Sequence, residues 1–284
     1  MPYQSEFELE NLLIEQLTSQ GYDEIVIKNE QQLKENLRHQ LFLYNKEKLN
    51  NIPFTDKEFE RVLTHLEGKT VFDSAKILRD KFLLEREDGT KVYIEFLNQK
   101  LWCKNKYQVT HQITVKGKYE NRYDVTLLIN GLPLVQIELK RRGLEMKEAF
   151  SQILRYKKHS YSGLFKYVQI FVISNGVDTK YFANSDKNLM YSQTFFWSDD
   201  KNNIITQLND FAYEFLDKCF ISEIISRYMV VNDYAKTLMV MRPYQIYAVK
   251  RAYNRVIETN KNGYIWHTTG SGKTLTSFKL SQLL

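Results

Sequence analysis

Two carboxylates and a lysine lie on neighbouring segments in the middle of the 284-residue chain. Asp124 falls in one stretch that predicts a strand, and Glu138 and Lys140 stand two residues apart in the next. Because side chains alternate between the faces of a strand, Glu138 and Lys140 share a face. Converging carboxylates can hold Mg²⁺, and a nearby lysine can orient or deprotonate a water and stabilise charge on a phosphate. Together, these three side chains could cut a phosphodiester.

The turn between the two strands determines whether the carboxylates can meet. Asn130-Gly131 is a strong hairpin-turn dipeptide between predicted strands at 123–129 and 134–140. A strict two-residue loop would set Asp124 one residue out of register, on the face away from Glu138. One additional residue would pair them directly. We therefore predict a three-residue loop or a β-bulge here, and a regular two-residue hairpin would exclude the metal site.

An aspartate near a strand end and a charged pair on a solvated face would be the ordinary explanation of this spacing. Three observations favour a site instead. The polar face of the second strand would be partly buried in a helix-covered sheet, where unpaired charge is costly. Gln152 and Tyr156 lie at i, i+4 on the next predicted helix and can point at the same place. Eight basic residues also crowd residues 136–166, against three glutamates. They are Lys140, Arg141, Arg142, Lys147, Arg155, Lys157, Lys158 and Lys166.

A second set of residues near the end of the chain predicts a nucleotide site. A predicted strand at 264–266 leads into a glycine-rich loop and then a helix. The loop residues are Gly270, Ser271, Gly272, Lys273 and Thr274. Backbone N–H groups of such a loop cradle phosphates at a helix N-terminus, with the lysine reaching the phosphates and the threonine holding Mg²⁺. His267 replaces the first glycine of the strict pattern, which fits the looser form found in helicases.

The remaining pattern predicts an α/β fold with a mixed central sheet flanked by helices. An amphipathic helix should begin after Ser5, which forms a capping box with Glu8. Further helices are expected within 28–90, at 145–159, over most of 198–235 and from 243 to about 258. Further strands are expected at 92–96, 107–115, 167–173 and 179–183, and the apolar run 167–173 should be buried on both faces.

The order Asp, Glu-x-Lys and Gln-x-x-x-Tyr resembles the PD-(D/E)xK nuclease superfamily, in its RecB-like branch. Residues 121–126, 130–140 and 171–176 resemble the restriction (R) subunit of type I restriction–modification enzymes more narrowly. The likeness runs from Tyr3-Gln4-Ser5-Glu6 to Met241-Arg242-Pro243-Tyr244-Gln245. It implies a PD-(D/E)xK nuclease domain over residues 1–228, followed by the beginning of a RecA-like helicase motor over 229–284.

The resemblance also implies roles for individual side chains. By this likeness Asp124 and Glu138 bind the metal, Lys140 is catalytic, and Gln152 and Tyr156 are needed for cleavage. RecB-like nucleases add a glutamate from the first helix, for which the candidates are Glu6 and Glu10. A solvated acidic helix face explains either glutamate equally well.

Gln245 has two interpretations. It resembles the adenine contact of superfamily 2 helicases, and it could equally belong to an ordinary helix N-terminus with proline at its first position. An ATPase also needs an acidic Mg²⁺ element and an arginine finger from later motifs. We therefore expect ATP binding in the complete protein and no hydrolysis by this chain alone.

The implied function is a Mg²⁺-dependent endonuclease domain that cuts double-stranded DNA after ATP-driven translocation, with methyltransferase (M) and specificity (S) subunits as partners. The alternative is a non-cleaving DNA-binding or docking module that couples the motor to those subunits.

Composition sets the outer bounds. The chain is 43% hydrophobic with 11 glycines and 4 prolines, which excludes a mainly disordered or collagen-like protein. Its net charge of +6 permits a nucleic-acid partner, and most of that excess lies in the segment around Lys140. Cys103 and Cys219 are expected to be ordinary thiols. With no secretory signal and no bilayer-length apolar run, we expect a soluble cytoplasmic protein with no membrane contact.

Overall fold

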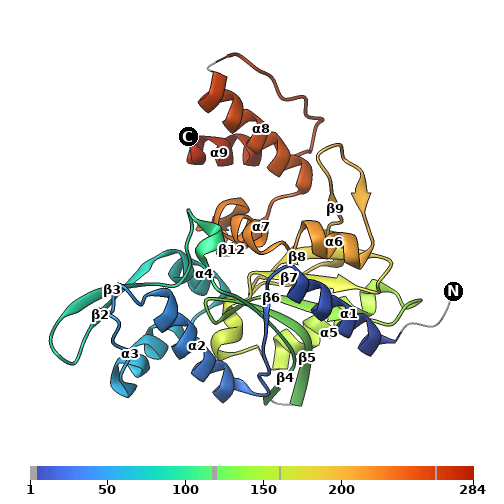
Figure 1. The fold of residues 1–284 in the computed structure, drawn as a ribbon. Coiled ribbons are helices and arrows are strands. Elements are labelled where there is room, and N and C mark those ends of the chain that lie inside the picture. The colour runs from blue at the N-terminus through green and yellow to red at the C-terminus, as the bar shows by residue number, and fades with distance from the viewer. Residues whose placement is uncertain (1–4, 117–119, 160, 260) are drawn as a thin grey trace.

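A computed structural model of the protein describes residues 5–116, 120–159, 161–259 and 261–284. A six-stranded mixed sheet forms its centre, in the order β1-β4-β5-β6-β7-β8, and helices cover it (Figure 1). β1 pairs with β4, and β6 with β7, in parallel, whereas the other neighbours are antiparallel. The strands are β1 (Asp23–Glu24), β4 (Tyr107–Lys116), β5 (Glu120–Ile129), β6 (Leu132–Leu139), β7 (Ile170–Ser174) and β8 (Thr179–Ala183). The predicted mixed α/β architecture is confirmed.

Helices and three small two-stranded sheets surround this centre. The helices are α1 (Glu6–Ser19), α2 (Glu30–Tyr44), α3 (Asp56–Leu66), α4 (Val71–Arg79), α5 (Met146–His159), α6 (Leu208–Glu214), α7 (Lys218–Glu223), α8 (Pro243–Thr259) and α9 (Lys273–Leu283). The small sheets pair β2 (Lys81–Glu85) with β3 (Lys91–Glu95), β9 (Trp197–Ser198) with β10 (Ile204–Ile205), and β11 (Met229–Asn232) with β12 (Thr237–Val240). No helix in these ranges is both long and apolar enough to cross a bilayer.

Helix α1 begins as the sequence predicts. The Ser5 side chain accepts the Glu8 N–H at 3.1 Å, and the Glu8 carboxylate accepts the Ser5 N–H at 3.0 Å. This reciprocal capping box satisfies two backbone donors at the helix N-terminus. Leu9, Leu13 and Leu17 form the buried stripe of the helix, and α1 thereby presents its first turn to the edge of the proposed site.

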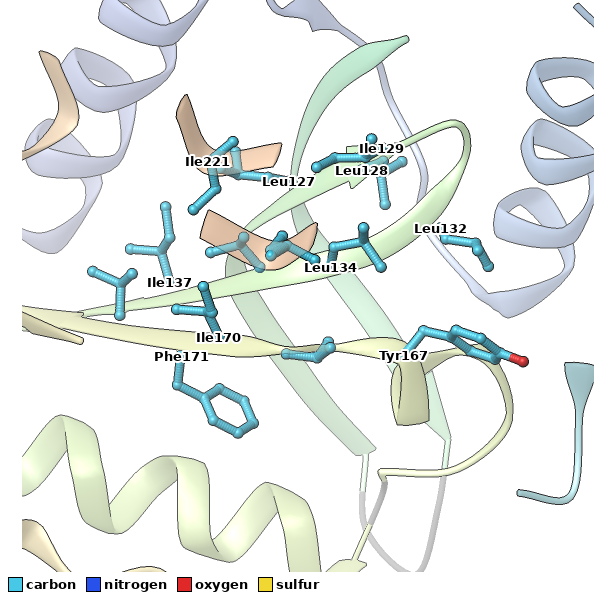
Figure 2. Packing of buried hydrophobic residues seen from close by; sticks show 14 of the residues in the cluster. Leu127, Leu128, Ile129, Leu132, Leu134, Ile137, Tyr167, Ile170, Phe171 and Ile221 are labelled. Atoms are coloured by element: carbon cyan, nitrogen blue, oxygen red, sulfur yellow. The ribbon is translucent and has the colours of Figure 1, made fainter. Parts of the chain in front are cut away.

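Strands β6 and β7 are buried on both faces, which was predicted for the apolar run 167–173, whereas the polar face of β6 was expected to be only partly buried. Every residue of β6 and β7 is buried, and Figure 2 shows apolar side chains of both strands within one hydrophobic cluster. β7 begins at Ile170, three residues later than predicted, because Gly163–Tyr167 forms a 3₁₀ turn. A strand with both faces covered leaves its polar side chains no water, so each polar group on β6 needs a partner.

Three secondary-structure predictions are wrong. Lys81–Glu85 is a strand rather than part of a helix, because Leu84 is buried where the strand pairs with β3. Helical structure covers only 208–214 and 218–228 within 198–235, and Ser198, Ile204–Ile205 and Met229–Asn232 belong to short strands. Residues 264–266 form no strand, since no described segment pairs with them, and the side chains of Tyr264 and Trp266 are each 89% exposed.

The expectation of two ordinary thiols is also wrong, because the fold joins Cys103 and Cys219 in a disulfide. The two residues are 116 positions apart, and their Cα atoms are 4.7 Å apart. Cys103 lies in a turn beside β4, and Cys219 lies on α7. No spacing rule in the sequence connects them, because packing of α7 against that turn creates the proximity.

The segment that follows the central domain packs back onto it. β12 contacts β8 and α4, and the Tyr181 hydroxyl donates to the Met241 carbonyl at 3.1 Å. Helices α8 and α9 also pack against each other. The domain boundary at 228/229 stays a prediction.

Candidate active site

A β-bulge brings Asp124 and Glu138 to one face of the sheet. At the turn the two strands pair as in a two-residue loop, but the register then shifts beside Leu127. Beyond the shift Val125 pairs with Ile137, so Asp124 follows opposite Glu138. The predicted bulge is confirmed, and it supplies the extra residue without which the two carboxylates would point to opposite faces.

The two carboxyl groups are held where negative charge is costly. Burial raises the pKa of Asp124 to about 6, against the lowering effects of the Leu139 N–H, which donates to its Oδ2 at 2.8 Å, and of Lys140. Glu138 is fully buried, and burial followed by repulsion from Asp124 raises its pKa well above the ordinary value. Neither oxygen of Glu138 accepts a hydrogen bond from the described residues. A buried carboxylate without donors is a site that a cation would stabilise.

Lys140 lies beside this pair. Its side chain is buried, its Nζ is 3.6 Å from Glu138 Oε1 and 3.7 Å from Glu6 Oε1, and it donates to the Leu139 carbonyl at 2.9 Å. The ammonium group is therefore directed at the carboxylates rather than at open solvent. It can stabilise negative charge next to whatever these carboxylates bind.

The donor set fits Mg²⁺ held by two protein carboxylates. In the part of the chain that the structure describes, no group of three or more His, Cys, Asp or Glu side chains is arranged as a metal site. Mg²⁺ is commonly held by one or two carboxylates and keeps several waters, whereas structural zinc requires four nitrogen or sulfur ligands. Asp124 and the unbonded oxygens of Glu138 meet the first requirement, and no described residues meet the second.

The two glutamates of α1 differ in their surroundings. Glu6 is half exposed at the rim of the site, where it accepts the Arg141 N–H at 3.3 Å. Glu10 is only 3% exposed, lies 2.8 Å from His111 Nδ1, and accepts a bond from the Gln112 amide. The solvated-face interpretation is therefore wrong for Glu10. Both glutamates raise the pKa of Asp124, which places their charges near the proposed metal site.

Helix α5 brings Gln152 and Tyr156 to the same pocket. The Gln152 amide donates to the Tyr156 hydroxyl, which in turn donates to the Arg122 carbonyl at 2.9 Å on the strand of Asp124. This pocket of about 560 Å³ joins β5, α5 and the start of α1. Its lining residues are Glu6, Asn121, Arg122, Asp124, Gln152, Arg155, Tyr156 and His159. The expectation that Gln152 and Tyr156 face one place is confirmed, while their catalytic role stays a prediction.

Gln112 is a part of this neighbourhood that sequence reasoning missed. It lies on β4 between two regular pairs with β5, at the position opposite Asp124, and its φ of 56° is left-handed. Such a conformation is unusual for a residue other than glycine and concentrates at functional sites. Its amide binds Glu10, so the distortion links α1 to the strand next to Asp124. Glutamine carries no sequence signal for this conformation.

The phosphate loop has the backbone geometry that its glycines predict. Gly270 and Gly272 have φ values of 79° and 80°, and α9 begins directly after them at Lys273. The Gln245 amide nitrogen donates to the Ser271 carbonyl at 2.8 Å, and its oxygen accepts the Arg242 N–H at 3.0 Å. Gln245 thus connects the start of α8 to the loop. Its proposed contact with adenine stays a prediction, as do the nucleotide roles of the loop residues.

Comparison with known protein families agrees with both parts of this description. The family model described as "Type I restriction enzyme R protein N terminus" matches residues 3–188, and the "SWI2/SNF2 ATPase" model matches residues 244–284. The first match contains the whole Asp124 to Tyr156 site, and the second contains Gln245 and the phosphate loop.

Individual relatives support the same assignment. The chain is 56% identical, over its full 284 residues, to the type I restriction enzyme SsaAORF53P endonuclease subunit of Staphylococcus saprophyticus, of which it covers 30%. It is 54% identical over its full length to the SauMSSORF170P endonuclease subunit of Staphylococcus aureus, of which it covers 31%. It is 42% identical over 261 residues to the EcoprrI endonuclease subunit of Escherichia coli, matching 88% of this chain and 81% of that protein. The chain therefore belongs to the family of type I restriction enzyme R protein N termini.

Proposed function

We propose that this chain is the Mg²⁺-dependent endonuclease part of a type I restriction R subunit, which cleaves double-stranded DNA. One observation carries the proposal. The bulged hairpin brings Asp124 to the fully buried, unbonded Glu138, with Lys140 Nζ 3.6 Å from it. An arrangement of two carboxylates with raised pKa values and an adjacent lysine is typical of a catalytic site. The names of the relatives above support the same activity.

Each residue has a defined part in this proposal. Asp124 and Glu138 would hold Mg²⁺, which supplies positive charge beside a phosphate and lowers the pKa of a water when bound. Lys140 would orient the attacking water and stabilise the charge that develops on the phosphate. Gln152 and Tyr156 would position the DNA strand, because their bonded pair forms the wall of the pocket beside Asp124.

The phosphate loop supports a proposal for a second role of this chain in the complete enzyme. We propose that Gly270–Thr274 binds the phosphates of ATP, with Mg²⁺ at Thr274 and adenine near Gln245. Lys273 and Thr274 are exposed at the start of α9, where a helix N-terminus favours anions. ATP-driven translocation would then precede cleavage, and M and S subunits would supply methylation and DNA-site selection.

Lys140→Ala tests the nuclease assignment in the complete R subunit, assembled with its partner subunits. We expect the variant to lose plasmid linearisation by about 10²-fold or more, because a charged group beside the reacting phosphate is removed. ATP hydrolysis should be unchanged. Lys158→Ala, which removes an exposed lysine from α5, is the matched control. Normal cleavage by Lys140→Ala with normal ATPase would contradict the assignment and favour the non-cleaving docking module.

A further inference from the structure

We propose that Arg122 and Arg155 form a two-arginine clamp that grips backbone phosphates of the DNA strand at the active site. The inference rests on the proposed nuclease function and adds to it the surface that holds the substrate. Neither arginine belongs to the Asp, Glu-x-Lys and Gln-x-x-x-Tyr pattern. The clamp is defined by these two residues and the pocket of about 560 Å³ between them.

The two arginines approach the pocket from different elements. Arg122 precedes Asp124 by two residues on β5, so both side chains leave the same face of that strand. Arg155 lies on α5 three residues after Gln152, on the helix face that lines the pocket. Asp124 therefore lies on a surface with one guanidinium on the strand wall and another on the helix wall.

No described residue gives the guanidinium group of Arg122 or Arg155 an anionic partner. Across the described parts of the chain, neither Arg122 nor Arg155 makes a side-chain hydrogen bond or an ion pair, and both are exposed. Other arginines form ion pairs. Arg38 Nη1 lies 2.6 Å from Asp56 Oδ1, and Arg86 Nε lies 2.7 Å from Glu58 Oε1. Two unpaired guanidinium groups beside carboxylates that would hold a metal form a place for external anions.

A DNA backbone phosphate fits this place better than an isolated anion. Guanidinium groups bind phosphate oxygens in a planar, bidentate manner. Arg122 lies about 6.6 Å along the strand from Asp124, at about 3.3 Å per residue. Each strand of a DNA duplex carries one phosphate per about 3.4 Å of helix axis, so a phosphate other than the one being cut falls within this span. A strand cut at Asp124 would thus place a neighbouring phosphate at Arg122.

A second pocket extends the positive surface along α5. It has a volume of about 420 Å³, shares Gln152 and Arg155 with the first pocket, and adds Lys140 and Lys147. Arg155 therefore stands between two adjoining pockets, each with at least two basic residues. Together the two pockets carry four Lys and Arg side chains and the carboxylates of Glu6, Asp124 and Glu148. Basic groups on both sides of a metal site suit a polyanion that passes through, whereas one phosphate ion would need only one of the pockets.

The clamp can be tested through the salt dependence of DNA binding. The complete R subunit is titrated with a non-specific duplex in EDTA between 50 and 200 mM salt. If each arginine neutralises one phosphate, Arg122→Ala/Arg155→Ala should reduce the slope of log affinity against log salt by about 1.8. The ratio of wild-type to variant affinity should then fall by about 12-fold as the salt concentration rises from about 50 to 200 mM. Inorganic phosphate at equal ionic strength should compete no better than chloride.

Three companion variants make the result decisive. Lys57→Ala/Arg61→Ala removes two exposed cations from α3, outside both pockets, and should leave the slope unchanged. Arg122→Lys/Arg155→Lys keeps the charges and should keep the slope, while losing several-fold in cleavage with the bidentate geometry. Lys140→Ala should lose cleavage and, because it removes one cation of the second pocket, should reduce the slope by no more than about 0.9.

The outcomes separate the two proposals. A slope for Arg122→Ala/Arg155→Ala equal to that of the α3 control would overturn the clamp, even if Lys140→Ala is inactive. Normal cleavage by Lys140→Ala would overturn the nuclease assignment, even if the slope falls as expected. A reduced slope together with inactive Lys140→Ala supports both.

Discussion

The bulged hairpin and the phosphate loop carry the two proposed sites, and they differ in how the protein supports them. Glu138 is buried on β6, which pairs with β5 on one side and β7 on the other, and the buried Lys140 follows directly after the end of that strand. Lys273 and Thr274 are exposed, and the segment before their loop pairs with no described strand. The first site is held by the core of the fold, whereas the second is held by a few local bonds.

This difference has a thermodynamic consequence. The hairpin keeps carboxyl groups in an environment that opposes their ionisation. The carboxylates that the proposed function requires therefore lower the free energy of unfolding. The functional groups of the loop stay exposed to water. Ordering the loop costs only the backbone conformational entropy of its glycines. Changes in the hairpin should therefore alter both cleavage and global unfolding. Changes in the loop should alter nucleotide binding alone.

The largest expected effect belongs to Glu138→Gln. Cleavage should fall by about 10³-fold, because a metal ligand is lost. In EDTA at pH 8 the free energy of unfolding should rise by about 1–3 kcal/mol, because burial and repulsion from Asp124 outweigh the attraction of Lys140 and oppose the ionised carboxylate, which a neutral amide replaces. Plasmid cleavage and urea unfolding measure the two effects. Glu145→Gln, an exposed change nearby, should leave both unchanged. Parallel losses of stability and activity would show that Glu138 is merely structural.

The next effect is a pH dependence that Asp124 should produce. Burial raises its pKa in the folded protein to about 6, from an ordinary value of 3.8. Between these values the folded state binds more protons than the unfolded state, so its stability falls as pH rises from 4 to 6. The difference corresponds to about 3 kcal/mol.

Asp124→Asn provides the comparison for that pH dependence. Urea unfolding in EDTA between pH 4 and 7 should show the stability of the wild type falling relative to the variant. Mg²⁺ should restore the wild type above pH 6, because it binds the ionised carboxylates, and should not restore the variant. If the free energy of unfolding changed with pH in the same way for the wild type and for Asp124→Asn, burial of Asp124 would not be the cause of the pH dependence.

Gly272→Ala should test the loop side of the comparison. The glycine has a φ of 80°, and a Cβ there would approach the Gln245 amide nitrogen to 2.5 Å. A left-handed alanine costs about 1–2 kcal/mol, so nucleotide affinity of the complete subunit should fall about tenfold or more. The midpoint temperature of thermal unfolding of the central domain should stay unchanged. Gln245→Ala/Gly272→Ala removes the steric conflict and should recover only part of the affinity.

The smallest expected effect concerns the cap that holds α1 beside the site. Ser5→Ala should reduce the free energy of unfolding by about 1 kcal/mol and weaken cleavage slightly, because Glu6 lies in the first turn. Thr55→Ala removes a similar capping box from α3, away from the pocket. It should cost the same stability with no effect on cleavage. Equal cleavage by Ser5→Ala and Thr55→Ala would show that the cap of α1 has no influence on the active site.

Much of the site could be predicted because its signals are local. The turn dipeptide, the alternation of side chains and the separation of Asp124 from Glu138 together required an extra residue in the hairpin, and the bulge supplies it. The i, i+4 spacing of Gln152 and Tyr156 was equally informative, because helix geometry depends only on neighbouring residues.

Other features could not be predicted because they depend on contacts between distant segments. The burial of Glu10 requires β4, and the pairing of Cys103 with Cys219 requires α7 to pack beside a turn 116 residues away. The strand predicted at 264–266 failed for the converse reason, since apolar residues form a strand only where another strand satisfies their backbone.

By itself, the sequence determined the mixed α/β class, the capped first helix, the bulged hairpin and the glycine geometry of the phosphate loop. The physical reason is that backbone periodicity, caps and turns depend on residues a few positions apart. Only the tertiary structure decided which charges are buried and which are free. Among the residues that the structure describes, no hydrogen bond reaches the carboxylate of Glu138 and no ion pair involves Arg122 or Arg155. Burial and pairing are properties of the whole packed chain, and here they set the chemistry of the site.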